Sequence, residues 1–150
     1  MKFVIQRVKE ATCTVEKEIT GHIAHGLCVF IGVSDTDTKA IADKMIQKMI
    51  NMRIFADDQD KTNLSLLDVN GEILLISQFT LYANCRKGNR PSFIEAGKPE
   101  FANDMYQYII EQCKKTIPDA QTGIFGADMQ ISLINDGPFT IVLDSKDLAI

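Results

Sequence analysis

The sequence predicts an α/β fold in which β-sheet dominates and two helices cover one side of the sheet. Three observations indicate this class: strand-like alternation fills the opening segment, two later segments carry apolar stripes with helical spacing, and the final third returns to strand patterns. The chain has 150 residues, 45% of them hydrophobic, which is enough for one core and too little for two comfortable domains. We therefore expect one domain, residues 1–150.

The opening segment, residues 3–33, is rich in β-branched residues and is interrupted at positions 16–17 and 25–26. This pattern predicts three or four strands joined by tight turns. Asp37 then stands where a helix N-cap is expected, because apolar residues recur after it at spacings of three and four. The residues of this first helical stripe are Ile41, Met45, Ile46, Met49, Ile50 and Ile54.

The middle of the chain predicts a buried strand, a long loop and a second helix. The polar stretch 57–63 follows the first helix, and the apolar run 73–76 is typical of a strand buried on both faces. Residues 84–99 are rich in Gly, Pro, Asn and charge, as in loops that carry function. The second helix ends at Pro118. Its apolar stripe consists of Phe101, Met105, Tyr108, Ile109 and Cys113.

Composition restricts the classes of function. The net charge of −4 argues against a general polyanion binder, because non-specific nucleic-acid affinity depends on Lys and Arg neutralising phosphates. Any RNA contact must therefore be local, and residues 86–90 form the densest basic stretch. No apolar run approaches the roughly 20 residues of a membrane span, and residues 1–7 lack an export signal. We expect a cytoplasmic protein that is not bound to a membrane and whose spread cysteines are free thiols: Cys13, Cys28, Cys85 and Cys113.

Two segments resemble metal sites without completing one. His22 and His25 lack a third ligand, so surface positions explain them better. The acidic stretch 57–68 invites a calcium loop, but Thr62 stands where glycine is required and Asp68 where glutamate is usual. We expect no metal and no cofactor.

Two further segments place polar groups where a cleft can form. Residues 77–80, with the sequence Ser-Gln-Phe-Thr, follow the buried strand. Residues 135–140 predict a turn between the last two strands, 129–134 and 140–143, and Gly137 followed by Pro138 permits a cis peptide bond. Each segment alone is weak, because ordinary turn chemistry explains such residues in most proteins. Together they are more specific.

The chain resembles the D-aminoacyl-tRNA deacylase family in seven segments, which occur in the family's order and cover nearly the whole chain. These are residues 6–8, 63–65, 71–74, 77–81, 87–93, 123–129 and 135–140. The resemblance implies two β-sheet layers that form a barrel-like core, with the two helices as a third layer on one side. It also implies an enzyme that hydrolyses the ester of D-aminoacyl-tRNA.

The resemblance further implies a homodimer with its active site at the subunit interface. Gly137 and Pro138, joined by a cis bond in this family, would project into the partner's site as a chiral gate. Their backbone carbonyls would leave no room for an L side chain, whereas a D side chain would point outward and glycine would pass. Arg7 would hold the gate, and Thr140 would hold the gate or the substrate's amino group. The aminoacyl-tRNA is the expected partner.

The resemblance places the catalytic groups in an opposing wall formed by Ser77, Gln78, Phe79 and Thr80. Backbone N–H groups around Phe79 would stabilise the developing oxyanion. Phe125 and Met129 would lie near the terminal adenosine of the tRNA.

The general base is the open question in this chemistry. The two histidines are far in sequence from either segment, and no Ser-His-Asp or Cys-His arrangement is present. Assistance by the neighbouring ribose hydroxyl of the tRNA is favoured over Thr80 as a nucleophile, because nothing in the sequence deprotonates a threonine.

Two alternatives remain. One is a non-catalytic RNA-binding module that uses residues 86–90. The other is a sister deacylase in which the Gly137–Pro138 bond is trans, so that the pocket accepts a small L-amino acid. Phe139 stands where valine is more usual in the family, and we expect it to alter packing behind the gate without changing the reaction.

Overall fold

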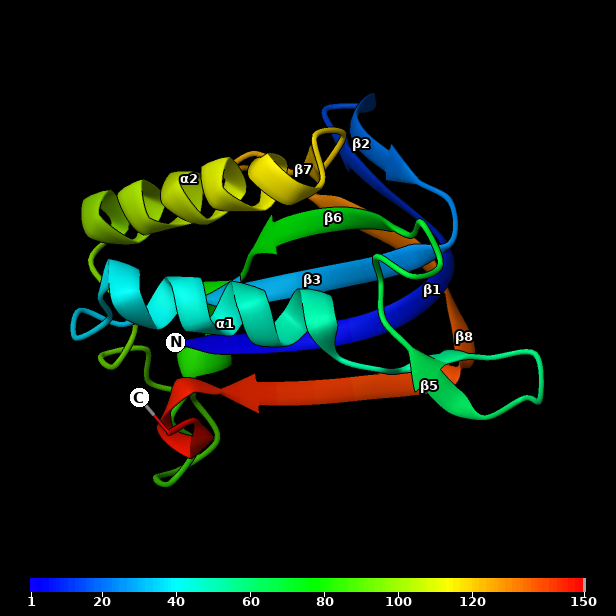
Figure 1. The fold of residues 1–150 in the computed structure, drawn as a ribbon. Helices are drawn as coiled ribbons and strands as arrows, with labels where there is room; N and C mark the ends of the chain where they lie inside the picture. Colours follow the sequence, from blue (N-terminus) through cyan, green and yellow to red (C-terminus); the bar gives the residue numbers. More distant parts are fainter. Residues whose placement is uncertain (150) are drawn as a thin grey trace.

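The computed structural model describes residues 1–149 and shows a strongly bent sheet with two helices lying across one face (Figure 1). The first three strands follow the predicted pattern; the first break falls at residues 16–17 as predicted, and the second falls at residues 24–25, one residue earlier than predicted. The elements in chain order are β1 (Lys2–Val15), β2 (Glu18–Ile23), β3 (Gly26–Gly32), α1 (Lys39–Asn51), β4 (Phe55–Ala56), β5 (Thr62–Leu64), β6 (Glu72–Ser77), η1 (Phe79–Tyr82), α2 (Pro99–Thr116), β7 (Gln121–Thr122), β8 (Gln130–Asp144) and η2 (Ser145–Asp147).

Strand β1 organises the main sheet because it pairs with three others. Its first half pairs with β3 and its second half with β2 on one edge, while β8 pairs along its opposite edge. The sheet continues from β3 through β6 to β7 in parallel pairs. It curls until β2 lies against β7, so closely that a Cβ at Gly21 would meet the backbone of Thr122 at 2.8 Å. The result is the predicted barrel-like core of two strand layers.

Two apolar clusters fill the molecule, one on each face of the sheet. The larger cluster lies between the sheet and the helices, and the smaller one lies inside the curl. Along β6, Ile73 and Leu75 join the larger cluster, whereas Leu74 and Ile76 join the smaller one. All four are buried, which confirms the prediction of a strand buried on both faces.

The two helices form the third layer and pack against each other (Figure 1). The prediction of Asp37 as the cap of α1 is wrong by one residue, because the Thr38 side chain accepts from the Ile41 N–H at 3.2 Å. Asp37 instead accepts from the amino group of Met1 at 2.6 Å and from the Ser34 N–H at 2.8 Å. Ile54 is buried but lies beyond the end of α1. No helix in the described part of the chain is long and apolar enough to cross a membrane.

The polar stretch after α1 contains a small hairpin, β4–β5, that was not predicted. Its turn is organised by Asp57, whose Oδ1 accepts from the N–H groups of Gln59 at 2.9 Å and Lys61 at 3.0 Å. These backbone hydrogen bonds, first that from Lys61, lower the pKa of Asp57. The segment is therefore an ordinary acidic turn.

The predicted turn at residues 135–138 is not a break between two strands. β8 runs continuously from Gln130 to Asp144, and its pairing with β1 shifts register between Gln6 and Val8. Gln6 pairs with Thr140 and Val8 with Asn135, so the extra residues of β8 form a bulge. Pairing on both sides of the bulge keeps the strand continuous, and Gly137 absorbs the distortion with φ +114°. No described peptide bond is cis, so the expected cis bond between Gly137 and Pro138 is corrected to trans.

Candidate active site

A groove opens where β6 ends, beside the start of α2. It is lined by residues 76–79, Phe93, 96–99, Ala102, 125–129 and Ile131, and we call it the candidate groove. It encloses about 610 Å³, within the range of small-molecule sites. The groove brings together five predicted site residues from two distant segments: Ser77, Gln78, Phe79, Phe125 and Met129.

The segment 77–80 changes direction at the mouth of this groove. Ser77 ends β6, the Gln78 N–H donates to the Ile31 carbonyl at 2.7 Å, and the chain then turns into the short helix η1. The N–H groups of Phe79 and Thr80 begin that helix and donate to no other described residue. Thr80 itself is exposed and accepts from Gln78 Nε2 at 2.6 Å. The segment thus presents backbone donors beside the groove.

Aromatic side chains form one wall of the groove. Phe79 is 54% exposed and meets Phe93 edge to face, with ring centroids 5.2 Å apart. Phe93 was not singled out from the sequence, although it ends one of the family-like segments. A large exposed aromatic pair in a groove is suited to contact a ligand.

The opposite wall comes from residues 125–129. The Phe125 ring lies 6.2 Å from the ring of Tyr106, whose hydroxyl donates to the Leu75 carbonyl at 2.7 Å. Burial raises the pKa of Tyr106, so this phenol stays protonated and holds α2 against β6. Met129 lies close to Gly123, where a side chain would collide with its sulfur.

The remaining predicted residues gather around the β8 bulge. Arg7 Nη1 donates to the Ile54 carbonyl at 2.6 Å, and Arg7 Nε donates to the Asp136 carbonyl at 3.0 Å. The guanidinium also lies 4.8 Å from the centroid of the Phe139 ring. Gly137 packs directly on Arg7, which leaves no room for a Cβ there. Arg7 therefore fixes the bulge that carries Gly137 and Pro138.

Two neighbours of the bulge, Gln6 and His25, were not predicted as site residues. Gln6 Oε1 accepts from Thr140 Oγ1 at 2.5 Å, which ties the far side of the bulge to β1. His25 Nε2 lies 3.6 Å from Asp136 Oδ2, and its ring meets Phe55 edge to face at 5.2 Å. His25 is far from residue 136 in sequence, so only the fold reveals this contact. Gln6 precedes Arg7 in the family-like segment 6–8, and this position was the only indication in the sequence that Gln6 belongs to the site.

The bulge and the candidate groove lie apart within one chain. Arg7 pairs with Leu27, and Leu27 pairs with Ile73, four residues before Ser77 on β6. Four residues correspond to roughly 13 Å along the strand. The bulge is therefore at least that far from Ser77, and β1 and β3 add to the separation. None of Arg7, Gly137, Pro138 and Thr140 lines the groove. The structure therefore brings the predicted site residues together in two separate groups.

The described residues offer few groups that can act as nucleophile or base. Burial raises the pKa of the Cys28 thiol to about 12 and that of Cys113 to about 12, so neither is a thiolate at neutral pH. Cys85 is an exposed free cysteine and directly precedes the basic stretch 86–90. His22 Nδ1 is hydrogen-bonded to Thr12 Oγ1 at 2.7 Å on an exposed face. No group of three potential metal ligands occurs among the residues described.

Comparisons with known proteins identify the family of the chain. The family model for D-Tyr-tRNA(Tyr) deacylase matches residues 4–144. D-aminoacyl-tRNA deacylases of Thermosipho africanus and Desulfotalea psychrophila are each 51% identical to the chain, over 97% and 99% of it and 98% and 99% of their own lengths. That of Flavobacterium johnsoniae is 50% identical over 98% of the chain and 99% of its own length.

Two solved structures share the fold. The c-Myc DNA Unwinding Element Binding Protein is 41% identical, with a TM-score of 0.91 and coverage of 96% of this chain and 98% of that one. A probable eukaryotic D-amino acid tRNA deacylase, 16% identical, has a TM-score of 0.82 over 95% and 97% of the two chains and shows the fold alone.

The family match and the identity to the three deacylases define the class of protein as a hydrolase that acts on the ester of aminoacyl-tRNA. Within that class, the chain belongs to the D-aminoacyl-tRNA deacylase family.

Proposed function

We propose that the chain hydrolyses the ester bond of D-aminoacyl-tRNA in the candidate groove, and so removes wrongly attached D-amino acids during translation in the cytoplasm. The observation that carries this proposal is the groove itself, where the backbone donors of Phe79 and Thr80 lie beside an exposed aromatic pair. The tRNA's terminal adenosine occupies the wall formed by Phe125 and Met129. An apolar, partly aromatic wall suits a nucleobase, because every base has a face that can stack.

The second half of the site comes from another copy of the chain. Residues 135–140 lie on an accessible bulge, and β8 has no strand partner on its outer edge among the described residues. Large apolar side chains are exposed along the same strand, with Ile134 at 49% and Val142 at 68%. In a two-fold dimer the same patch of both subunits forms the interface, so two equivalent sites result. Each site then combines one subunit's groove with its partner's bulge.

Handedness is judged by the backbone of Gly137 and Pro138. A main-chain wall excludes a side chain on one side of the substrate's α-carbon whatever that side chain is. The enzyme therefore accepts many D-amino acids, and glycine as well. Arg7 and Thr140 keep this wall in position through their hydrogen bonds to residues 136 and 6.

Catalysis relies on preorganised donors and on the substrate. The N–H groups of Phe79 and Thr80 stabilise the oxyanion of the tetrahedral intermediate, with Ser77 and Gln78 completing the wall. Neither histidine lines the candidate groove of its own chain. The ribose hydroxyl next to the ester activates the attacking water, and the aminoacyl ester is already reactive.

One observation favours a second candidate function. The trans bond between Gly137 and Pro138 turns the carbonyl of the gate differently from the expected cis bond, and a sister deacylase with a trans gate would admit a small L-amino acid. The high identity to D-aminoacyl-tRNA deacylases supports the first candidate.

The experiment that separates these functions is deacylation of matched substrates by the purified protein. We expect release of amino acid from D-tyrosyl-tRNA and glycyl-tRNA, with L-tyrosyl-tRNA and L-alanyl-tRNA intact. Release from L-alanyl-tRNA would favour the sister deacylase. Binding of tRNA without release from any ester would show a nucleic-acid-binding module, and the name of the c-Myc DNA Unwinding Element Binding Protein describes that protein as one that binds nucleic acid.

A further inference from the structure

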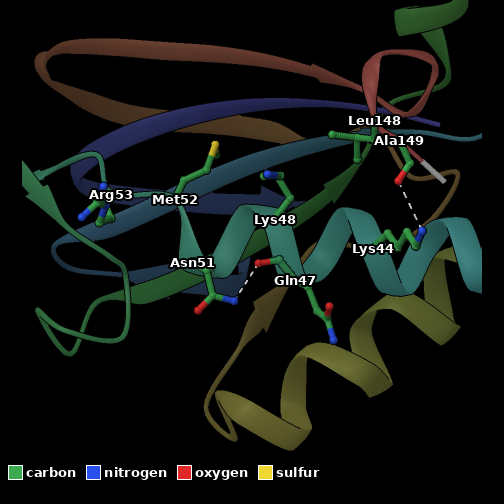
Figure 2. Close-up of a pocket in the computed structure, with 8 residues that line it drawn as sticks. All are labelled: Lys44, Gln47, Lys48, Asn51, Met52, Arg53, Leu148 and Ala149. Atoms are coloured by element: carbon green, nitrogen blue, oxygen red, sulfur yellow. Dashed lines mark hydrogen bonds between the residues drawn. The ribbon is translucent and has the colours of Figure 1, made fainter.

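A second groove follows the side of α1 and contains none of the residues of the candidate site. Figure 2 shows its lining, which runs from Lys44 along the helix to Arg53, with Leu148 and Ala149 at one end. We call it the α1 groove. It encloses about 590 Å³, many times the roughly 30 Å³ share of one water molecule. The space therefore suits an extended ligand better than a single ion.

The lining of the α1 groove is strongly basic. Lys44, Lys48 and Arg53 supply three cations, and none of the described residues that line the groove is acidic. The ion pairs found in residues 1–149 involve none of these three. Lys44 donates to the Ala149 carbonyl at 3.3 Å and Arg53 Nη1 donates to Asn63 Oδ1 at 3.3 Å, and both of these acceptors are neutral.

Helix stability explains only part of this pattern. Lys48 lies in the last turn of α1, where a cation interacts favourably with the helix dipole. Lys44 is four residues earlier on the same face, and like charges at that spacing weaken a helix by a few tenths of a kcal/mol. Arg53 lies beyond the end of the helix. Helix stability alone therefore does not explain the three cations.

The spacing of the cations indicates the kind of anion. Lys44 and Lys48 are roughly 6 Å apart along the helix axis, and the head group of Arg53 lies farther along in the same direction (Figure 2). Charges arranged in a row match successive phosphates of a nucleic-acid strand, whereas a single phosphate needs donors that converge. Gln47 and Asn51 add neutral amides to the same groove, and amides can contact ribose hydroxyls.

The α1 groove also lies in a suitable place relative to the candidate groove. Lys98 and Pro99 line the candidate groove, and the Lys98 N–H donates to Asp35 Oδ1 at 2.8 Å, just before α1 begins. α1 therefore starts near the candidate groove and leads away from it. A tRNA whose aminoacyl end occupies the candidate groove can extend along this helix.

We propose that the α1 groove binds the phosphate backbone of the tRNA body, with Lys44, Lys48 and Arg53 as the phosphate contacts. This inference rests on the proposed function and adds to it a second anchoring surface away from the ester. The net charge of −4 makes such a local surface necessary, because the protein as a whole repels a polyanion. The contiguous basic stretch 86–90 is not part of this groove.

The test uses the full-length variant Lys48→Glu/Arg53→Glu with two substrates: D-tyrosyl-tRNA, and D-tyrosyl adenosine ester, which lacks the tRNA body. On D-tyrosyl-tRNA we expect KM to rise about tenfold or more at low salt with kcat nearly unchanged. The slope of log(1/KM) against log salt should fall in magnitude by roughly 1.5 to 2, as for two lost phosphate contacts. Activity on D-tyrosyl adenosine should not change.

The matched control is Lys114→Glu/Lys115→Glu on the last turn of α2, which alters net charge equally at another place. An equal KM increase in this control would overturn the proposal, because the effect would come from overall charge. An unchanged KM in the α1 variant, with active wild-type enzyme, would also overturn it, and an acidic protein would become the better candidate occupant. A wild type inactive on both substrates would instead contradict the proposed function.

Discussion

Arg7 shows how one side chain can organise a part of the structure without taking part in the chemistry. Its guanidinium donates to carbonyls of Ile54 and Asp136, which lie far apart in sequence, and its face lies against Phe139. These contacts use the planar, multiple-donor geometry that lysine lacks. Phe139 takes part in this packing, which explains how an aromatic residue is accommodated behind the bulge. Arg7 therefore couples the bulge to the hairpin region after α1.

The two histidines allow a direct test of whether a protein base is used. His22→Ala and His25→Ala should each leave kcat on D-tyrosyl-tRNA within about tenfold of wild type, because the proposed function assigns activation of the water to the ribose hydroxyl of the substrate and neither ring lines the groove of its own chain. The measurement is single-turnover deacylation, with circular dichroism to verify folding. His22 serves as the control, since it only meets Thr12 on an exposed strand face. A loss of more than roughly 100-fold in His25→Ala alone would identify it as a general base.

At the scale of elements, the bulge in β8 converts an ordinary edge strand into a projecting loop. Pairing with β1 resumes on both sides of residues 136–139, so the loop has a rigid base. Gly137 is the residue that permits this shape, because φ +114° is strained for any side chain. A rigid base and a constrained turn are what a steric gate requires.

Gly137→Ala should therefore weaken chiral discrimination. An added Cβ collides with the Arg7 guanidinium and strains the backbone, which displaces the gate at a cost of about 1–3 kcal/mol. We expect the ratio of kcat/KM for D- over L-tyrosyl-tRNA to fall at least about tenfold, mostly through faster L hydrolysis. Gly88→Ala is the matched control, because Gly88 also has positive φ, at +63°, but has open space around it. If both variants keep the wild-type ratio, Gly137 has no part in selection.

Local patterns in the sequence were sufficient for most elements. The apolar stripes of α1 and α2 and the double burial of β6 depend on neighbours within a few residues, and periodicity records those. The β8 bulge depends on pairing with Gln6 and Val8 more than 120 residues away, so residues 135–138 looked like a simple turn. Asp37 looked like a cap for the same reason, because its partner Met1 is distant in sequence.

The candidate site was only partly predictable. Resemblance to a family supplied Ser77, Phe79, Phe125 and Met129, which the fold then placed around one groove. His25 carried no local signal, since its contact with Asp136 exists only after β1, β3 and β8 assemble. Sequence patterns also gave no sign of the α1 groove, whose cations are spaced along a helix instead of forming a run.

At the scale of the whole molecule, the β8 bulge and the candidate groove occupy different places on one chain, so the proposed function requires two chains for a complete site. Hydrolysis and chiral selection can then be disrupted in separate chains, and two such variants can be tested together by mixing them. Ala127→Trp should fill the candidate groove and abolish activity while leaving the β8 bulge intact, because Ala127 lines the groove and residues 135–140 do not. Gly137→Ala retains an open groove beside a displaced partner gate.

Mixing these two variants should restore selectivity in trans. Gly137→Ala alone hydrolyses both enantiomers, and excess Ala127→Trp chains supply intact gates to its open grooves through subunit exchange. We expect L-tyrosyl-tRNA hydrolysis to fall several-fold as Ala127→Trp is added, while D-tyrosyl-tRNA hydrolysis persists. A double variant carrying both changes is the control, because it supplies no intact gate and should leave the L rate unchanged. If Ala127→Trp has no effect although size-exclusion chromatography of tagged chains shows mixed dimers, each chain must select handedness with its own residues, and the shared site is ruled out.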